Sequence, residues 1–225
     1  MFSAEQILYE DNHLIAINKR VGQIVQADKT GDVPLIDELK AFIKQRDGKP
    51  GNVFCGLIHR LDRPVSGVVL FAKTSKALSR MTVMVRDRQL TKSYWAVVKN
   101  APPNKQALVE DYLKKNEAQN KSYVVDANTP GAKVARLEYA LVATSDGGYH
   151  LLEVNLLTGR HHQIRCQLAH MGSPIKGDLK YGAPRSNADG SISLHARRIA
   201  FEHPVSHEQL TIVAPNEEFE RMFRV

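Results

Sequence analysis

The apolar run Val68-Val69-Leu70-Phe71 is the feature that most restricts the fold of this chain. It follows the breakers Pro64 and Ser66-Gly67, and this pattern predicts a buried strand that is entered from a loop. The loop carries one carboxylate, Asp62, between Arg60 and Arg63. A buried strand gives such a loop a rigid support, so the loop is able to hold a reactive side chain. The alternative is a surface turn with an Arg–Asp ion pair, which contributes little to stability.

The rest of the pattern contains more strands than helices and arranges the strands in hairpins. Ser145-Asp146-Gly147-Gly148 lies between strand-like segments at 136–142 and 149–156, which is a strong hairpin signal. Because strict βα alternation is absent, the pattern predicts an α+β fold. Helical spacing and caps predict helices at 35–45, from Thr74 or Ser75 to Val85, at 161–170 and at 217–223. The spacing predicts that Leu78, Met81, Thr82 and Val85 of the second helix face the core, and that Ile164 and Leu168 of the third face inward. Further strands are predicted at 7–10, 14–19, 92–98, 191–201 and 210–213, and the polar run 114–121 is predicted to be an exposed hairpin end.

Charge favours a polyanionic partner. The 31 lysine and arginine residues exceed the 24 aspartate and glutamate residues, so the net charge is +7, and basic surface gains affinity by displacing counterions from phosphates. Cys55 and Cys166 are far apart and lack CxxC spacing, which predicts reduced, buried thiols. No signal-peptide pattern and no apolar run near about 20 residues is present, so a soluble, cytoplasmic protein without membrane contact is expected.

Four motifs follow one another along the chain: His59-Arg60-Leu61-Asp62 with Ser66-Gly67; Lys92-Ser93-Tyr94; Leu157-Thr158-Gly159-Arg160-His161-His162-Gln163-Ile164-Arg165; and Gly177-Asp178 before Tyr181-Gly182. In order and spacing they resemble the RluA family of RNA pseudouridine synthases. The opening at Tyr9-Glu10-Asp11 and Asn18-Lys19 is similar too. The chain departs from the family at Lys19-Arg20, where Lys-Pro is usual, and at Pro64-Val65, where a Thr often precedes Ser-Gly.

The resemblance implies one pseudouridine-synthase-like catalytic domain over residues 1–225. This domain would have a mixed and largely antiparallel sheet, flanking helices and a central RNA-binding cleft, and no separate N-terminal RNA-binding module. The implied activity converts specific uridines in structured ribosomal or transfer RNA to pseudouridine. Because this isomerisation needs no redox change and no external energy, no cofactor is expected. No metal is expected either, because no ligand set appears in the sequence, and no obligate protein partner is evident.

The resemblance also assigns the catalytic residues. Asp62 is the implied nucleophile, and one carboxylate is chemically sufficient in principle. Attack on the base, attack on the sugar and elimination at the sugar all stay open. Tyr94 is implied to stack on the target base near the proton that leaves C5, although a strand position alone favours a core aromatic. Arg165 is implied to lie against Asp62 and keep it ionised by charge pairing; the alternative is a solvated arginine on a helix.

The implied substrate-binding residues fall into two groups. A uridine inside folded RNA must be flipped out to be reached, and Arg60, beside His59, resembles the arginine that enters the vacated stack. Arg160, His161 and His162 sit where a helix is predicted to begin, and there backbone N–H groups and cationic side chains are able to meet a phosphate. A metal site at the adjacent histidines is disfavoured, because neighbours on a helix point about 100° apart and no carboxylate or cysteine cluster completes a ligand set.

Two other functions would explain part of the sequence. A non-catalytic RNA-binding module would explain the charge and the aromatic residues, but it would not require Asp62 in an otherwise basic loop. A glycoside hydrolase would need a second carboxylate at a defined distance from the first, and no motif in the chain supplies one.

Overall fold

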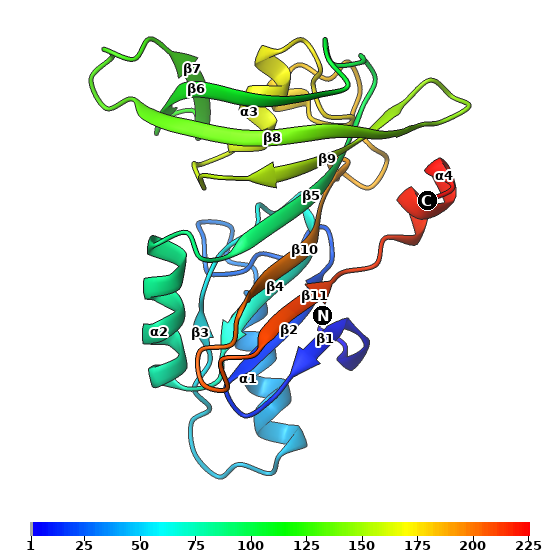
Figure 1. Cartoon of the computed structure of the whole chain (residues 1–225). Coiled ribbons are helices and arrows are strands. Elements are labelled where there is room, and N and C mark those ends of the chain that lie inside the picture. Colours follow the sequence, from blue (N-terminus) through cyan, green and yellow to red (C-terminus); the bar gives the residue numbers. More distant parts are fainter. Residues whose placement is uncertain (1) are drawn as a thin grey trace. The chain divides into compact units, whose positions relative to one another are not determined.

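The computed structural model describes residues 2–225 and divides the chain into two compact units (Figure 1). The first unit contains the residues up to Leu90 together with Ala196–Pro215, and the second contains Thr91–His195 together with Asn216–Val225. Neither unit is one continuous stretch of sequence. Each unit combines helices with antiparallel strand pairs, which confirms the predicted α+β class. The single catalytic domain stays a prediction.

The first unit is built on a sheet in which β2 and β4 are central. The two strands are antiparallel, with Leu14 opposite Ala72 and Lys19 opposite Gly67. The last residues of β2 and the first residues of β4 therefore lie side by side. Residues 67–72 are all buried, which confirms the predicted buried strand. The order is β1 (Ile7–Glu10), β2 (Leu14–Lys19), β4 (Ser66–Ala72) and β10 (Leu194–Glu202, in this unit from Ala196), with β3 (Gly56–Leu57) on β4 and β11 (Gln209–Val213) on β10.

The described part of this unit contains two α-helices and the 3-10 turn η1 (Ala4–Gln6). The helix α1 (Leu35–Arg46) buries Leu35, Leu39 and Ile43, three of the apolar residues that its spacing places on one face. Thr74 caps the N-terminus of the helix α2 (Ser75–Arg86), as predicted. Its hydroxyl oxygen accepts a hydrogen bond from the amide of Ala77 at 3.2 Å. Thr82, which the spacing predicts to face inward, is exposed.

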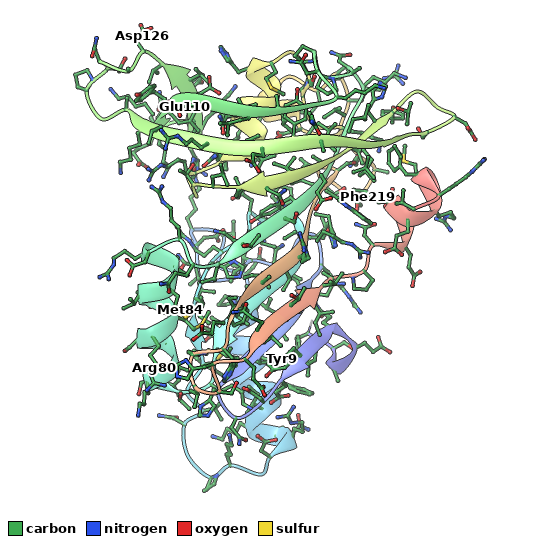
Figure 2. All side chains as sticks on the ribbon, viewed as in Figure 1. Tyr9, Arg80, Met84, Glu110, Asp126 and Phe219 are labelled. Carbon is green, nitrogen blue, oxygen red and sulfur yellow. The ribbon has the colours of Figure 1, made fainter. Side chains whose placement is uncertain are left out.

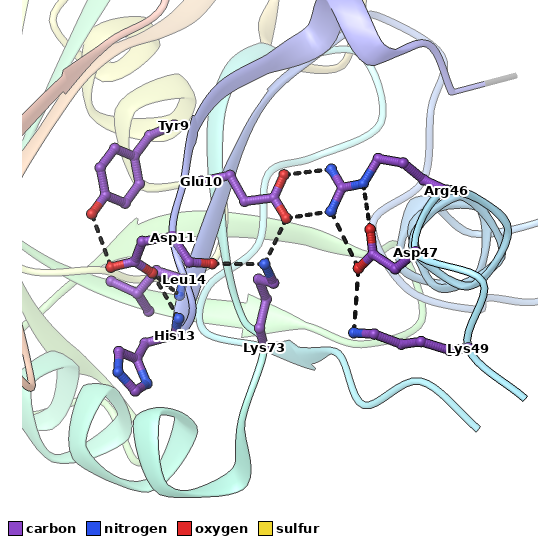
Figure 3. A network of polar contacts seen from close by, with 9 residues as sticks. All are labelled: Tyr9, Glu10, Asp11, His13, Leu14, Arg46, Asp47, Lys49 and Lys73. Atoms are coloured by element: carbon purple, nitrogen blue, oxygen red, sulfur yellow. Dashed lines mark hydrogen bonds and ion pairs between the residues drawn. The ribbon is translucent and has the colours of Figure 1, made fainter. Parts of the chain in front are cut away.

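A charged network joins three elements near the strand ends where Leu14 lies opposite Ala72 (Figure 3). The Glu10 carboxylate, at the end of β1, accepts hydrogen bonds of 2.6 and 2.7 Å from Arg46 in the last turn of α1. Lys73, just after β4, donates to Glu10 and to the carbonyl oxygen of Asp11, both at 2.6 Å. The bonds from Arg46 are the main reason that the pKa of Glu10 lies below its usual value. The loop that carries Asp62 lies at the opposite ends of these strands, where Lys19 is opposite Gly67.

The second unit is an antiparallel sheet. The predicted hairpin is present as β8 and β9, with Thr144 opposite His150 and with Gly148 at a φ of +68°. The polar run 114–121 also forms the predicted hairpin end, because β6 and β7 pair around it from Asn116 and Lys121 onward. The strand order is β5 (Thr91–Val98), β9 (His150–Leu156), β8 (Lys133–Thr144), β6 (Gln106–Asn116) and β7 (Lys121–Val125).

Helices cover parts of this second sheet. The helix α3 (Gln163–His170) begins two residues later than predicted and buries Ile164 and Leu168, as expected. The helix α4 (Glu217–Phe223) places Phe219 (labelled in Figure 2) and Phe223 in one apolar cluster with Val97 and Leu151. A short 3-10 turn, η2 (Leu179–Tyr181), follows Asp178.

One expectation from composition is also met. Cys55 and Cys166 are free and buried, and burial raises the pKa of Cys55 to about 12, so this thiol is a poor nucleophile. Within residues 2–225, no helix has the length and the apolar character needed to span a membrane.

Candidate active site

Asp62 lies in the loop between β3 and β4, as predicted, and its side chain is half-buried. Leu61 and Val65 are buried on either side of it, so apolar contacts anchor the loop while Asp62 stays in reach of solvent. The amide of Val65 donates to the carbonyl oxygen of Asp62 at 3.1 Å, which closes a turn. The loop therefore presents its carboxylate from a fixed backbone.

His59 and Arg60 differ in their surroundings. Nε2 of His59 accepts a hydrogen bond from the amide of Leu70 at 3.2 Å, which holds the imidazole against β4. Arg60 is exposed, as a side chain that enters an RNA stack must be. Contact of these two residues with RNA stays a prediction.

Arg63 closes the same loop from the other side. Its carbonyl oxygen accepts from the amide of Gly22 at 3.0 Å, and its Nε donates to the Gly22 carbonyl oxygen at 3.1 Å. Its guanidinium also binds the Asp32 carboxylate. The charge of Arg63 is therefore engaged by Asp32, and an ion pair with the neighbouring Asp62 is not needed to explain this turn.

Lys19 is fully buried beside this loop, and sequence analysis did not single it out as a site residue. Its Nζ donates to the carbonyl oxygens of Arg20 at 3.1 Å, Gln23 at 2.9 Å and Arg63 at 3.2 Å. Burial lowers the pKa of Lys19 to about 7, and the negative charge of Asp62 opposes this effect. Lys19 thus joins the end of β2 to the Asp62 loop and interacts electrostatically with the carboxylate.

Gly67, where β4 begins, has a φ of +114°, and a Cβ there would lie 2.4 Å from the carbonyl oxygen of Ala196. We expect Gly67→Ala to lower the free energy of unfolding by about 3 kcal/mol or more, because backbone strain and overpacking each cost about 1–3 kcal/mol. Urea denaturation measures the change. Gly51→Ala is the control, since no atom lies within 4 Å of its Cβ position; equal losses for both variants would contradict this role of Gly67.

Tyr94 is a buried residue of β5 in the second unit, opposite Val154 of β9. Ala96 and Val98, at alternate positions of the same strand, are buried too, as the alternation predicts. Lys92 shares this face of β5, and burial lowers its pKa. A core aromatic would occupy the same position, so the role of Tyr94 in catalysis stays a prediction.

Arg165 lies on α3 and is only 6% exposed, so its interpretation as a solvated helix arginine is wrong. Its Nε donates to Oδ2 of Asp178 at 2.7 Å, and its Nη2 donates to Oδ1 at 2.9 Å. In the sequence Asp178 was only part of a loop motif, and nothing local marked it as the partner of Arg165. The pairing of Arg165 with Asp62 stays a prediction.

Arg160 precedes α3 and is anchored inside the second unit. Its Nε donates to the carbonyl oxygen of Val134 at 2.9 Å, and its backbone amide donates to Oε1 of the buried Gln163 at 3.0 Å. Gln163 therefore engages one backbone N–H group of the segment that is predicted to meet a phosphate. A phosphate contact through the Arg160 side chain stays a prediction.

The imidazoles of His161 and His162 are stacked with ring centroids 3.8 Å apart. The expected separation of about 100° does not apply, because His162 precedes the helix with a φ of +52°. Nδ1 of His161 is 2.9 Å from Oγ of Ser122, and Nδ1 of His162 is 3.0 Å from the hydroxyl oxygen of Tyr181. Hydroxyl groups therefore orient both rings. Residues 2–225 contain no group of three or more metal-ligating side chains that could hold an ion.

The sequence profile of the family described as RNA pseudouridylate synthase matches residues 13–170. This range includes Asp62, Tyr94 and Arg165. The chain belongs to this family. The match confirms the family predicted from the four motifs.

Relatives of this RNA pseudouridylate synthase family member carry related names. A ribosomal large subunit pseudouridine synthase C from Vibrio cholerae is 33% identical over 94% of this chain and 65% of its own length. An uncharacterized RNA pseudouridine synthase from Synechocystis is 33% identical over 93% and 64%. The chain thus spans slightly less than two thirds of these two relatives. A tRNA pseudouridine synthase C from Pasteurella multocida is 33% identical over 93% of this chain and 90% of its own length.

Solved structures show the same fold. The human protein RNA pseudouridylate synthase domain containing 4 superposes with a TM-score of 0.78 and 25% identity, over 96% of this chain and 90% of that one. The human protein RNA pseudouridylate synthase domain containing 1 superposes with a TM-score of 0.73 and 20% identity. At this identity the likeness shows the fold alone. The predicted pseudouridine-synthase-like fold is therefore confirmed.

Proposed function

We propose that this protein is an RNA pseudouridine synthase, an isomerase that converts specific uridines of structured ribosomal or transfer RNA to pseudouridine in the cytoplasm. The observation that carries the proposal is the Asp62 loop. A family-matching carboxylate stands on a backbone that is held by Lys19, Gly22 and the turn at Val65, beside a buried ammonium group. Family membership and the names of the relatives support the same activity.

The proposed reaction conserves all atoms. The bond between N1 of uracil and C1′ of the ribose breaks, the base turns, and a bond between C5 and C1′ forms. C5 then loses a proton and N1 gains one, so no oxidant, reductant or energy source is required. Asp62 serves as nucleophile and stabiliser, and Arg165 pairs with its charge. Attack on the base, attack on the sugar and elimination at the sugar are alternative first steps.

The remaining site residues act on the flipped nucleotide. Tyr94 stacks on the uracil and lies near the proton that leaves C5. Arg60, which is exposed, fills the gap that the uridine leaves in the RNA stack, and the neighbouring His59, held by the Leu70 amide of β4, binds the RNA beside it. Arg160, His161 and His162 bind phosphate, since cations that stand together at a fixed position suit the RNA backbone.

Tyr94→Phe tests the hydroxyl group of this tyrosine. We expect folding and RNA binding to persist, because the ring still stacks, while turnover falls by about 10²-fold or more if the oxygen serves the proton step. Single-turnover pseudouridine formation measures the effect. Tyr139→Phe, a buried tyrosine of β8, is the matched control. Wild-type turnover in Tyr94→Phe would return Tyr94 to a core aromatic.

Salt dependence tests the phosphate contacts. With a net charge of +7, RNA affinity is expected to fall linearly in log–log terms with salt, by roughly 10²-fold between about 50 and 200 mM if about five phosphates are contacted. Arg160→Gln should weaken binding and reduce the slope by about 1. Arg224→Gln, at an exposed ion pair on Asp146, should leave the slope unchanged. A flat salt dependence in the wild type would contradict phosphate-dominated binding.

Incubation with total cellular RNA followed by an assay for pseudouridine tests the proposed function as a whole. Formation of pseudouridine supports the synthase. RNA binding without product would indicate a non-catalytic binding module, and release of free base or sugar would indicate a hydrolase. Mapping of pseudouridines in RNA from cells that lack the protein then identifies the target uridine and distinguishes ribosomal from transfer RNA.

A further inference from the structure

The buried pair of Arg165 and Asp178 is the charged contact that the proposed mechanism leaves unexplained. Asp178 is only 1% exposed and Arg165 only 6%. The two hydrogen bonds, of 2.7 and 2.9 Å, join both carboxylate oxygens to the Nε–Nη2 edge of the guanidinium. Such a bidentate pair fixes the plane of the guanidinium as well as its position. The Nη1 end of Arg165 is therefore directed away from Asp178.

The backbone around Asp178 is itself immobilised. Its carbonyl oxygen accepts from the amides of Tyr181 at 3.1 Å and Ala183 at 3.0 Å. Gly177, just before it, has a φ of +87°, and a Cβ there would lie 2.7 Å from the carbonyl oxygen of Ser191. Side chains are excluded at this point, and Asp178 is thereby held at one place relative to α3.

The same segment is joined to the strand that carries Tyr94. Ile175 forms a bridge with Val98 of β5, and the amide of Lys176 donates to the carbonyl oxygen of Val97 at 2.8 Å. The carboxylate that holds Arg165 is thus fastened, within three residues, to β5. A shift of Asp178 would change the position of Arg165 relative to Tyr94.

Tyr181 holds the guanidinium from its face. The centre of the Arg165 guanidinium lies 5.1 Å from the centroid of the Tyr181 ring, within the range of a cation–π contact. The hydroxyl of Tyr181 accepts a hydrogen bond from the amide of Ser122 at 2.9 Å, so this ring is fixed as well. Arg165 is therefore fixed along one edge by Asp178 and on one face by Tyr181.

We infer that Asp178 is a positioning residue for the reaction, which acts by fixing the orientation of the Arg165 guanidinium. The inference rests on the proposed function, in which Arg165 pairs with Asp62. Stability alone is a weak reason for such a pair, because apolar residues of similar volume often stabilise a fold as well as a buried ion pair does. A fixed guanidinium is useful where it must pair with a reacting carboxylate in one geometry. A misplacement of about 1 Å is enough to reduce a rate about 100-fold.

A double-mutant cycle tests this inference on the full chain. Wild type, Asp178→Asn, Arg165→Met and the double variant are compared for single-turnover rate, RNA dissociation constant and urea unfolding. We expect Asp178→Asn to lower the rate about 100-fold and to change the RNA dissociation constant less than threefold. Because Asp178 acts through Arg165, the double variant should be no slower than Arg165→Met.

Asp111→Asn is the matched control. Asp111 accepts a hydrogen bond of 2.9 Å from Nε2 of the buried Gln167, so this variant removes another carboxylate that serves α3 without touching Arg165. It should lose stability and keep the wild-type rate. If Asp178→Asn does not fold, Asp178→Glu takes its place in the cycle, since it keeps the charge and moves it by one methylene group; we then expect a rate at least tenfold below wild type.

The outcomes separate this inference from the proposed function. A wild type that forms no pseudouridine in any cellular RNA would overturn both. An active wild type, with the rate of Asp178→Asn or its Glu replacement within threefold of it, would overturn the inference alone. So would rate losses that multiply in the double variant, because Asp178 would then act independently of Arg165.

Discussion

Replacement of Asp62 by asparagine is expected to lower the single-turnover rate of pseudouridine formation by at least about 10⁴-fold, or ~5.5 kcal/mol of barrier. Asparagine keeps the size and the hydrogen-bonding shape of aspartate but has no negative charge and is a poor nucleophile. The loop should keep its conformation, since Leu61, Val65 and Lys19 hold it through contacts that do not require the Asp62 side chain. RNA binding should persist or tighten, because one negative charge near phosphates is removed.

The measurement uses enzyme in excess over a validated RNA substrate, after folding and RNA binding of the variant have been checked. Asp37→Asn is the matched control, since it removes an exposed carboxylate paired with Lys40 on α1 of the same unit. The control should stay within threefold of the wild-type rate. Product formation by Asp62→Asn within tenfold of wild type would mean that Asp62 is not the nucleophile.

Lys19→Met is expected to lower the free energy of unfolding by about 3 kcal/mol. Methionine fills similar volume but donates no hydrogen bond, so three carbonyl oxygens in a partly buried region each lose one donor, although the Arg63 oxygen keeps the Gly22 amide. A lost partner costs about 1–3 kcal/mol. Because one of these oxygens belongs to Arg63, the Asp62 loop should loosen and turnover should fall as well. Lys40→Met, at an exposed ion pair, should change stability by about 1 kcal/mol or less.

The ionisation of Lys19 is tested by measuring, as a function of pH, the difference in free energy of unfolding between wild type and Lys19→Met. Burial lowers its pKa to about 7, whereas an unfolded chain has the ordinary lysine value of about 10.4. Between these values the unfolded state binds one proton more than the folded state, so the stability of wild type relative to Lys19→Met should rise with pH, by up to about 1.4 kcal/mol per pH unit. Below pH of about 7 the difference should be constant. A difference that does not change across this window would contradict the lowered pKa.

The elements that could be predicted from the sequence are those determined by local patterns. Glycines in Ser145–Gly148 mark the β8–β9 hairpin, and the cap at Thr74 marks the start of α2. The apolar run before Phe71 identifies a buried strand because no exposed element would tolerate it. The prediction that Thr82 faces the core is wrong. Its spacing fits an inward face, but the side chain is exposed and its hydroxyl donates to the carbonyl oxygen of Leu78 one turn earlier.

The site could be predicted less completely, because its supports come from distant parts of the chain. Lys19 ends an apolar strand, where a lysine is normally expected to reach solvent, and only the register opposite Gly67 turns it into a buried donor. Asp178 follows Arg165 by a loop whose path depends on β5. The stacked imidazoles depend on the left-handed conformation of His162, which is uncommon for any residue other than glycine, so a histidine is only a weak local signal for it.

The discontinuous first unit imposes an order on biosynthesis. The strand β4 is complete at Ala72, but β10, which lies beside it in the sheet, enters this unit only at Ala196. At about 5–20 residues per second, the ribosome reaches Ala196 on the order of ten seconds after Ala72. During that interval one edge of a highly apolar strand has no neighbour from β10, and such edges readily pair with other chains. The nascent chain is thus most exposed to aggregation while its second unit is being made.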